Sequence, residues 1–302
     1  MLSEVCPGIS RIESKLGARR VAQWVARGSE GALLLDTGIA GTPTAHVLPA
    51  LHELGLPAES VVEVVNSHAD VDHYGGNAEA REAFRKARLR AHPLDRPLID
   101  SWQRIASERY GWYRSHGLDY PAAAWEWLRE SAGAQIVLDG TVQDGERIDL
   151  GGLSLEVVHL PGHSPGHIGL IEPASGTALI ADAAMGGGFC DVDGRLVSPA
   201  PYVDVAAYRA TLGRLQALDP ARLETAHFPS MTGPEVGRFL ESSKLLVDRL
   251  EGVLAEALAG EQAPFTLAQL TERCDAALGP YPEMPVELSR SVGAHLEALA
   301  AG

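Results

Sequence analysis

The chain has 302 residues, of which 45% are hydrophobic and 22% charged, and this composition excludes a largely disordered chain. The 40 acidic residues outnumber the 25 basic ones, which gives a formal net charge of −15. An acidic surface repels a phosphate backbone, so we expect no nucleic-acid partner.

The cysteines and the N-terminal segment indicate the compartment. Cys6, Cys190 and Cys274 are far apart and form no Cys-x-x-Cys pair, which argues against a disulfide framework and against a thiolate zinc site. The segment 1–15 has no basic start followed by an apolar run, and no apolar stretch approaches the roughly 20 residues of a membrane helix. We therefore expect a cytoplasmic protein without a membrane partner.

Short apolar and β-branched runs, bounded by Gly, Pro or polar residues, predict strands. In chain order these runs begin at Val21, Gly31, Val61, Leu153 and Thr177. Apolar residues three and four positions apart predict helices over 43–54, 78–87 and 205–218. The arginines between Arg81 and Arg96 alternate with Glu and apolar residues, as on the solvated face of a helix. Strands alternating with helices predict a layered α/β architecture.

Two segments read as additions to this core. Residues 92–134 hold four of the five tryptophans and predict a helical, aromatic cap insert. Its aromatic rings either line a substrate pocket or pack onto the core or onto a second subunit. A homodimer is therefore one of the alternatives. Residues 236–302 predict a helical C-terminal extension, which either resembles a small winged-helix domain or serves packing or dimerisation.

The segment that follows the strand VVEVV holds several potential metal ligands close together, and its sequence is NSHADVDHYGGN. It places His68, Asp70, Asp72 and His73 within six residues, where the chain turns through two glycines. A loop can direct such side chains to one point, whereas a strand would send alternate ones to opposite faces. Nitrogen and oxygen ligands together suit zinc, iron or manganese.

Three further segments place a potential ligand where an apolar strand ends. They hold His163 in LPGHSPGH, Asp182 in TALIAD and His227 in LETAHFP. Each residue taken singly could cap a strand or form a local hydrogen bond. Four such segments in chain order favour one shared metal site.

These motifs resemble those of the metallo-β-lactamase-fold hydrolases, which carry an Asp, His-x-His-x-Asp-His, Pro-Gly-His-(Ser/Thr)-x-Gly-His, an Asp and a final His in this order. The resemblance spans residues 5–235 and implies a catalytic domain over 1–235 with a four-layer αββα sandwich. It implies that His68 and His163 bind a first metal ion and that Asp72, His73 and His227 bind a second, with Asp182 bridging. Asp36 and His167 are expected to support these ligands.

Asp70 departs from the family pattern, which has a histidine at this position. Its carboxylate either binds the first ion, or is too short to reach it and leaves one ion, or bonds only a water molecule. We predict that Asp70 is a ligand, because the di-iron members of the superfamily carry Glu there. A carboxylate ligand would favour iron or manganese at this position.

The resemblance implies a hydrolase that holds one or two ions, with zinc as the first expectation, and attacks a carbonyl with metal-bound hydroxide. Asp72 and Asp182 are the expected catalytic residues, the first orienting the nucleophile and the second passing a proton to the leaving group. The expected partner is a small ester, thioester or lactone. Met185 replaces a Tyr of the acyl-homoserine lactone hydrolases, which argues against that substrate. The alternative, motivated by Asp70, is an iron-dependent oxidoreductase of the same fold, either persulfide dioxygenase-like or di-iron.

Overall fold

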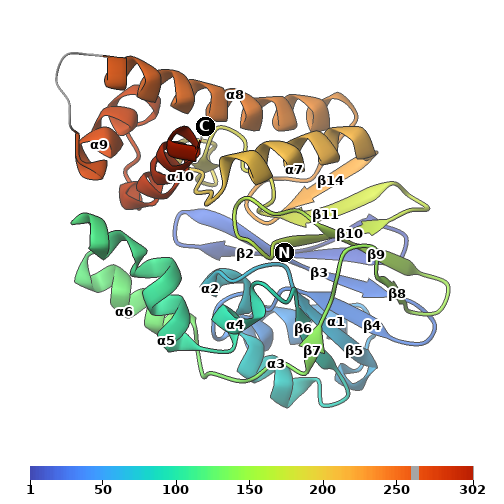
Figure 1. The fold of residues 1–302 in the computed structure, drawn as a ribbon. Coiled ribbons are helices and arrows are strands. Elements are labelled where there is room, and N and C mark those ends of the chain that lie inside the picture. Colours follow the sequence, from blue (N-terminus) through green and yellow to red (C-terminus); the bar gives the residue numbers. More distant parts are fainter. Residues whose placement is uncertain (260–264, 302) are drawn as a thin grey trace.

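The computed structural model describes residues 1–259 and 265–301, which form two facing β-sheets with helices on both outer sides (Figure 1). The first sheet has the strand order β1 (Leu2–Cys6), β2 (Ile9–Leu16), β3 (Arg19–Arg27), β4 (Ala32–Leu35), β5 (Val61–Asn66), β6 (Arg88–Ala91) and β7 (Gly140–Thr141). The second has the order β15 (Met231–Thr232), β14 (Arg222–Thr225), β11 (Thr177–Ala181), β10 (Ile168–Glu172), β9 (Ser154–His159) and β8 (Arg147–Asp149). The short strands β12 (Phe189–Cys190) and β13 (Leu196–Ser198) pair separately.

Helices form the two outer layers and the aromatic insert, and α8 (Pro234–Ala259), the first helix of the predicted C-terminal extension, belongs to an outer layer. The outer layers also use α1 (Leu48–Glu53), α3 (Asn77–Ala83) and α7 (Val205–Leu218). The insert holds α4 (Arg96–Ile99), α5 (Trp102–Arg104), a π-helical segment Ile105–Tyr110, a 3₁₀ turn Trp112–His116 and α6 (Ala122–Ser131). The remaining helical elements are a π-helical turn Pro43–Val47, 3₁₀ turns at Ala58–Ser60 and Pro285–Glu287, and α2 (Val71–Tyr74), α9 (Leu267–Leu278) and α10 (Leu288–Ala301).

Three apolar clusters correspond to the interfaces between these layers. Between the sheets, Trp24 and Leu33 of the first pack with Leu155 and Leu179 of the second. On the outer side of the first sheet, Leu51 and Phe84 join Leu34 and Val64 in one cluster. A third cluster covers the second sheet with α7 and α8, and it also includes side chains of α9 and α10. The predicted αββα sandwich is therefore confirmed.

The prediction of a solvated helix face between Arg81 and Arg96 was wrong. α3 ends at Ala83, and Arg88–Ala91 forms strand β6, which pairs in parallel with β5. The alternation in RLRA has the period of a strand, with Leu89 in the apolar cluster. Arg90 is buried because its guanidinium pairs with Glu63 at 2.9 Å, and its apolar stem covers the sheet.

The strand ends place the sequence motifs at one edge of the sandwich. β4 and β5 are parallel in the first sheet, as are β11 and β14 in the second, so each pair ends on the same side. The backbone has positive φ at two non-glycine residues there, 64° at Asp36 after β4 and 43° at Ala181, the last residue of β11. Such conformations cost energy and concentrate at functional sites, so we expect the functional side chains at this edge.

No helix in the ranges 1–259 and 265–301 is long and apolar enough to cross a membrane.

Candidate metal centre

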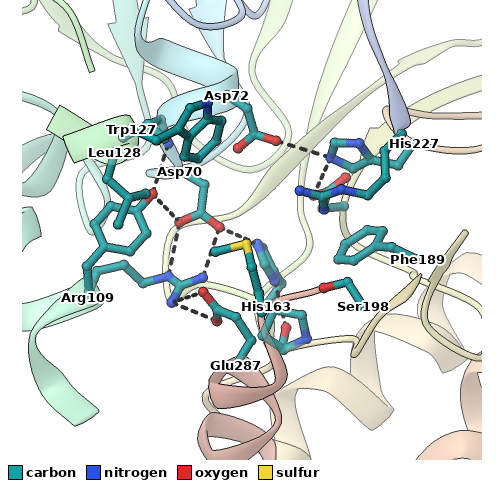
Figure 2. Close-up of a pocket in the computed structure, with 16 residues that line it drawn as sticks. Asp70, Asp72, Arg109, Trp127, Leu128, His163, Phe189, Ser198, His227 and Glu287 are labelled. Atoms are coloured by element: carbon teal, nitrogen blue, oxygen red, sulfur yellow. Dashed lines mark hydrogen bonds and ion pairs between the residues drawn. The ribbon is translucent and has the colours of Figure 1, made fainter. Parts of the chain in front are cut away.

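Seven side chains from both sheets converge at this edge, and five of them line one pocket in Figure 2. His68 and Asp70 lie in the loop after β5, and Asp72 and His73 lie in α2, which follows directly. The second sheet contributes three residues that follow β9, β11 and β14, namely His163, Asp182 and His227. The structure thus brings together all seven residues that the sequence predicted as ligands.

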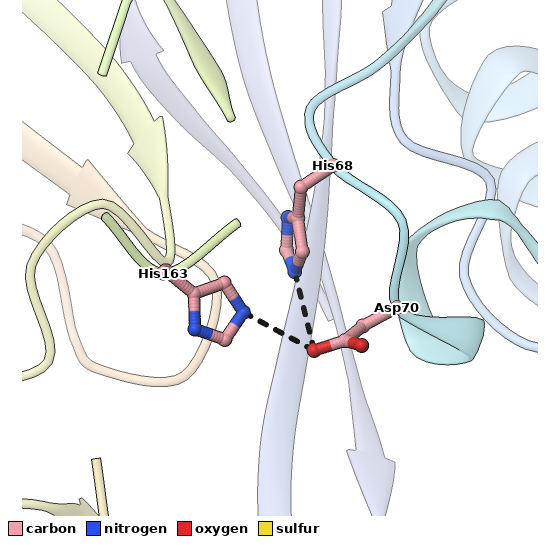
Figure 3. Close-up of side chains that lie close together, drawn as sticks. All are labelled: His68, Asp70 and His163. Atoms are coloured by element: carbon pink, nitrogen blue, oxygen red, sulfur yellow. Dashed lines mark hydrogen bonds and ion pairs between the residues drawn. The ribbon is translucent and has the colours of Figure 1, made fainter. Parts of the chain in front are cut away.

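His68, Asp70 and His163 form a first group of three potential ligand atoms (Figure 3). The Oδ2 of Asp70 lies 3.1 Å from Nε2 of His163 and 3.8 Å from Nε2 of His68. These separations bring one carboxylate oxygen and two imidazole nitrogens around a common point. Asp70 therefore lies where a ligand to the first ion would lie.

Asp72, His73 and His227 form a second group. The Oδ2 of Asp72 lies 3.4 Å from Nε2 of His227 and 3.9 Å from Nε2 of His73. Asp182 lies between the two groups, because its Oδ2 is 3.3 Å from Nε2 of His227 and 4.0 Å from Nε2 of His68. The family resemblance implied a division into two sites along these lines, and a third group of His68, His73 and Asp182 joins the two.

The four imidazoles all direct Nε2 into the cluster, because their Nδ1 atoms have partners outside it. Nδ1 of His163 donates to the carbonyl of Pro201 at 2.7 Å, and Nδ1 of His227 donates to that of Arg20 at 2.7 Å. Such outer contacts fix the tautomer and the ring orientation of a metal-binding histidine.

The remaining two imidazoles depend on Asp36. Its carboxylate accepts from Nδ1 of His73 at 2.8 Å and from the hydroxyl of Ser67 at 2.7 Å. Since that hydroxyl donates to Asp36, it accepts from Nδ1 of His68, which lies 2.9 Å away. Asp36 thus orients His73 directly and His68 through the hydroxyl of Ser67, as a residue that supports the ligands would do.

The donor set fits a divalent cation. The Nε2 atoms of His68 and His73 are fully buried and have no hydrogen-bond partner in the described structure. A buried polar atom without a partner is costly, and a cation held by both nitrogens would remove that cost. Imidazole and carboxylate ligands together are the chemistry of zinc, iron and manganese sites.

The electrostatics favour the cation-binding forms of His68 and of the carboxylates, whereas at His227 the neighbouring Asp182 and Asp72 outweigh burial and raise the pKa to about 9, so that a cation must displace a proton there. Burial, together with the neighbouring His73, lowers the pKa of His68 well below its usual range and keeps this imidazole neutral. Burial alone would raise the pKa of Asp182, but His227 and His73 outweigh it and hold the pKa well below its usual range. Neutral imidazoles and ionised carboxylates are the states in which these groups act as ligands.

Two supporting residues that sequence analysis missed belong to the insert. Arg109 binds both oxygens of Asp70, with Nε 3.0 Å from Oδ1 and Nη2 3.1 Å from Oδ2. Tyr110 donates to Oδ1 of the same carboxylate at 3.2 Å and accepts from the backbone N–H of Val71. No sequence signal marked them, because both lie in the aromatic insert, far from any ligand motif.

Asp95 is a third residue that sequence analysis missed. It is fully buried and accepts hydrogen bonds from the backbone N–H groups of Ala69 and Gly166 and from the hydroxyl of Ser164. It therefore joins the loop after β5 to the loop that holds His163. Burial raises the pKa of Asp95 despite these donors.

The other histidines contribute little to the cluster, with one exception. Nε2 of His167 accepts from the backbone N–H of Asp182 at 3.2 Å, and its ring stacks on His68 at 4.7 Å. His46 and His52 are exposed. His92 and His159 stack on each other at 4.2 Å.

The pocket over the cluster has an empty volume of about 480 Å³. Trp127, Leu128 and Phe189 line it with the ligands. A second, mostly apolar hollow of about 550 Å³ shares Arg19, Trp127 and Met284 with the pocket. The two hollows are therefore neighbours, and the aromatic insert supplies part of the wall of each.

A two-sheet sandwich with a histidine and aspartate cluster at one edge defines a class of metal-dependent hydrolases. The model of the metallo-beta-lactamase superfamily matches residues 16–227, and the chain belongs to that superfamily. The resemblance that the motifs indicated is therefore confirmed, and the chain is a metallohydrolase.

The curated relatives are named as hydroxyacylglutathione hydrolases and as acyl-coenzyme A thioesterases. The hydroxyacylglutathione hydrolase of Aeromonas salmonicida is 27% identical over 234 residues, which cover 77% of this chain and 71% of that protein. The human acyl-coenzyme A thioesterase MBLAC2 is 27% identical over 203 residues, 64% of this chain and 66% of that protein. A shorter match, to a hydroxyacylglutathione hydrolase of Haemophilus influenzae, is 45% identical over 51 residues and spans only 24% of that protein.

Solved structures share the fold over nearly the whole chain. A metallo-beta-lactamase family protein of Thermus thermophilus matches with a TM-score of 0.75 and 21% identity, over 99% of this chain and 95% of that one. A beta-lactamase domain protein of Burkholderia ambifaria matches with a TM-score of 0.76 and 19% identity, over 99% and 88%. At this identity the likeness concerns the fold alone.

Proposed function

We propose that the chain is a zinc-dependent thioesterase that cleaves small thioesters with an apolar acyl group. The observation that carries the proposal is the convergence of four imidazole Nε2 atoms and three carboxylates at one edge of the sandwich, beside a pocket with an apolar hollow next to it. The relatives named above support thioesters over other acyl compounds, and they favour hydrolysis over the iron-dependent oxidation that Asp70 suggested.

The residues of the cluster would have three roles, namely metal binding, orientation of the attacking water and proton transfer. A divalent ion at the cluster would supply a Lewis acid that makes hydroxide available near neutral pH. His68, Asp70 and His163 would hold one ion and Asp72, His73 and His227 a second, with Asp182 shared. Asp72 would orient the attacking water, and Asp182 would carry a proton to the departing thiolate sulfur, since both carboxylates line the pocket.

The apolar hollow next to the metal-ligand pocket would hold the acyl group of the substrate. Leu16, Ala124 and Met284 line the neighbouring hollow, which shares the ring of Trp127 with the pocket. Burying an acyl chain there gains roughly 0.8 kcal/mol for each methylene removed from water. Arg19, at the junction, has its guanidinium 5.7 Å from the ring centroid of Phe189 and could receive a polar substituent of the substrate.

The test is an assay of the purified chain with measured metal content. Thioesters with acyl chains of increasing length should be cleaved with rising kcat/KM, and a chelator should abolish the activity until zinc is returned. His227→Ala should remove activity, while His46→Ala, which changes an exposed histidine of the π-helical turn Pro43–Val47, should not. Full activity of metal-free protein would refute the proposal, and iron in the protein with oxygen uptake on a thiol substrate would favour the oxidoreductase.

A further inference from the structure

The two groups of the cluster differ in what holds their carboxylates. Both oxygens of Asp70 are occupied by the insert, Oδ1 by Nε of Arg109 and by the hydroxyl of Tyr110, and Oδ2 by Nη2 of Arg109. The ion-pair partners of Asp72 and Asp182 in the described chain are histidines. Figure 2 shows the guanidinium of Arg109 facing Asp70 from the side opposite to Asp72.

Arg109 is itself fixed in this position. Its Nη1 lies 3.1 Å from Oε2 of Glu287, in the C-terminal segment just before α10, and 3.2 Å from the hydroxyl of Tyr113. Glu287 in turn accepts from the hydroxyls of Tyr113 at 2.6 Å and Tyr120. All four side chains are buried, so the guanidinium can turn away from Asp70 only by breaking a buried network.

A planar guanidinium that binds both oxygens of a carboxylate competes with a cation for the same lone pairs. An ion in the first group must share Oδ2 of Asp70 with Nη2 of Arg109 and must approach this positive charge at close range. An ion in the second group meets no such competitor, since Asp72 contacts only His73 and His227 among the ion-pair partners. The first group should therefore bind its ion more weakly.

We infer that Arg109 is a positioning residue that holds Asp70 in an ion pair and thereby lowers the affinity of the first group for its metal ion, so that the two ions bind in unequal steps. The inference rests on the metal centre of the proposed function, but not on the substrate. It assigns the aromatic insert and the segment at Glu287 a role in setting how many ions the site holds.

The experiment removes the metal from the full chain and then titrates it with zinc. Calorimetry and competition with a chromophoric chelator measure the affinity of each binding step. The unchanged chain should show a tight step and a weak step, or the tight step alone. In Arg109→Gln the weak step should tighten at least tenfold, or a second ion should become detectable, while the tight step stays within threefold. Cobalt in place of zinc gives a visible absorption spectrum that reports the same two steps.

Two further variants separate this role from a general structural one. Arg109→Lys keeps the positive charge beside Glu287 but cannot bind both oxygens of Asp70, so its weak step should tighten by a smaller factor of two to five. The double variant Asp70→Asn with Arg109→Gln should lose the gain, because the competition is for Asp70. Circular dichroism and thermal melting check the fold of each variant.

Each outcome decides the inference. A weak step that is unchanged or weaker in Arg109→Gln would overturn it, and if that variant does not fold, an unchanged weak step in Arg109→Lys would do the same. A gain that persists without Asp70 would also overturn it. Ion binding with these steps but without thioester hydrolysis would refute the proposed function and leave this inference standing.

Discussion

The carboxylate of Asp36, which directly follows β4, accepts the Nδ1–H of His73 in α2 at 2.8 Å and so orients this imidazole toward the cluster. The backbone of Asp36 has a φ of 64°, a conformation that Asn tolerates as well as Asp.

We therefore expect Asp36→Asn to keep the fold and to lower the zinc affinity of the second group by about 10- to 100-fold, since the acceptor that fixes His73 becomes an amide. Equilibrium dialysis against a zinc buffer measures this change. Asp219→Asn is a matched control, because Asp219 is an exposed aspartate at a φ of 43° after α7. Equal affinity in the two variants would contradict the expected role.

Replacing Asp182 should affect turnover more than binding. Asp182→Asn keeps the shape of the side chain but removes the charge that lies between the two groups. We expect kcat to fall by about 10²- to 10⁴-fold, the range that a lost proton-transfer residue produces, with a smaller change in KM. Steady-state kinetics at saturating zinc measures both, with the exposed Asp193→Asn as the control. A change confined to KM would contradict the assignment.

Removal of the metal should lower the melting temperature. The buried Nε2 atoms of His68 and His73 lose their partner, and the charged carboxylates around them lose the cation. At a zinc concentration about 1,000 times the Kd, the ion stabilises the fold by about 4 kcal/mol, which corresponds to a shift of roughly 6 °C for a chain of 302 residues. Differential scanning calorimetry with and without chelator checks this, and identical melting curves would count against a bound ion.

An acid-sensitive contact lies away from the metal centre. Nε2 of His295 in α10 lies 2.9 Å from the hydroxyl of Tyr202, and burial lowers the pKa of His295 to about 4. An unfolded histidine has a pKa of about 6.5, so between about pH 6.5 and 4 the unfolded chain binds a proton that the folded chain refuses.

The free energy of unfolding should therefore fall as the pH drops from about 6.5 to 4, by about 3 kcal/mol from this residue, and His295 should contribute almost no slope well above that range. His295→Gln keeps a polar partner for Tyr202 without titrating, so its stability should fall less over the same interval. Urea denaturation at several pH values compares the two chains. Parallel curves would show that His295 is not the source of the slope.

A buried ion pair joins the two sheets. Nη1 of Arg11 on β2 lies 3.0 Å from Oε2 of Glu224 on β14, and Nε1 of Trp24 donates to the same oxygen at 3.3 Å. Arg11→Met leaves a buried charge without its partner and should cost about 3–5 kcal/mol of unfolding free energy. The double variant with Glu224→Leu should recover part of that loss, and chemical denaturation of the three chains measures it. A single variant as stable as the unchanged chain would contradict the prediction.

The sequence predicted the central strands, because their apolar runs are continuous and are followed at once by ligand motifs. It did not predict β1 and β2, whose residues 2–16 mix charged and apolar side chains. Arg11 and Glu13 lie in a strand because they pair with Glu224 and Arg20, and such partners are known only from the fold. Strand β6 was not predicted for the same reason, because Arg88 and Arg90 pair with Glu63 of β5.

The ligand cluster was predictable and its surroundings were not. The ligands follow strands in recognisable motifs, so spacing and order were sufficient to name them. Arg109 and Glu287 lie 39 and 217 positions from Asp70 in a helical insert and before the last helix, and neither lies in a motif. Only the packing of the insert against the C-terminal segment reveals that they share a site.

The two sheets each supply part of the ligand set, and this division limits how the sandwich can change. A slip of one residue along a strand moves a side chain by about 3.3 Å, whereas ligand distances tolerate about 0.2 Å. Over evolution, the surface loops can lengthen freely, while the apolar layer around Trp24 and Leu155 must preserve the alignment of one sheet on the other. Substitutions in that layer should therefore impair ion binding before they unfold the protein.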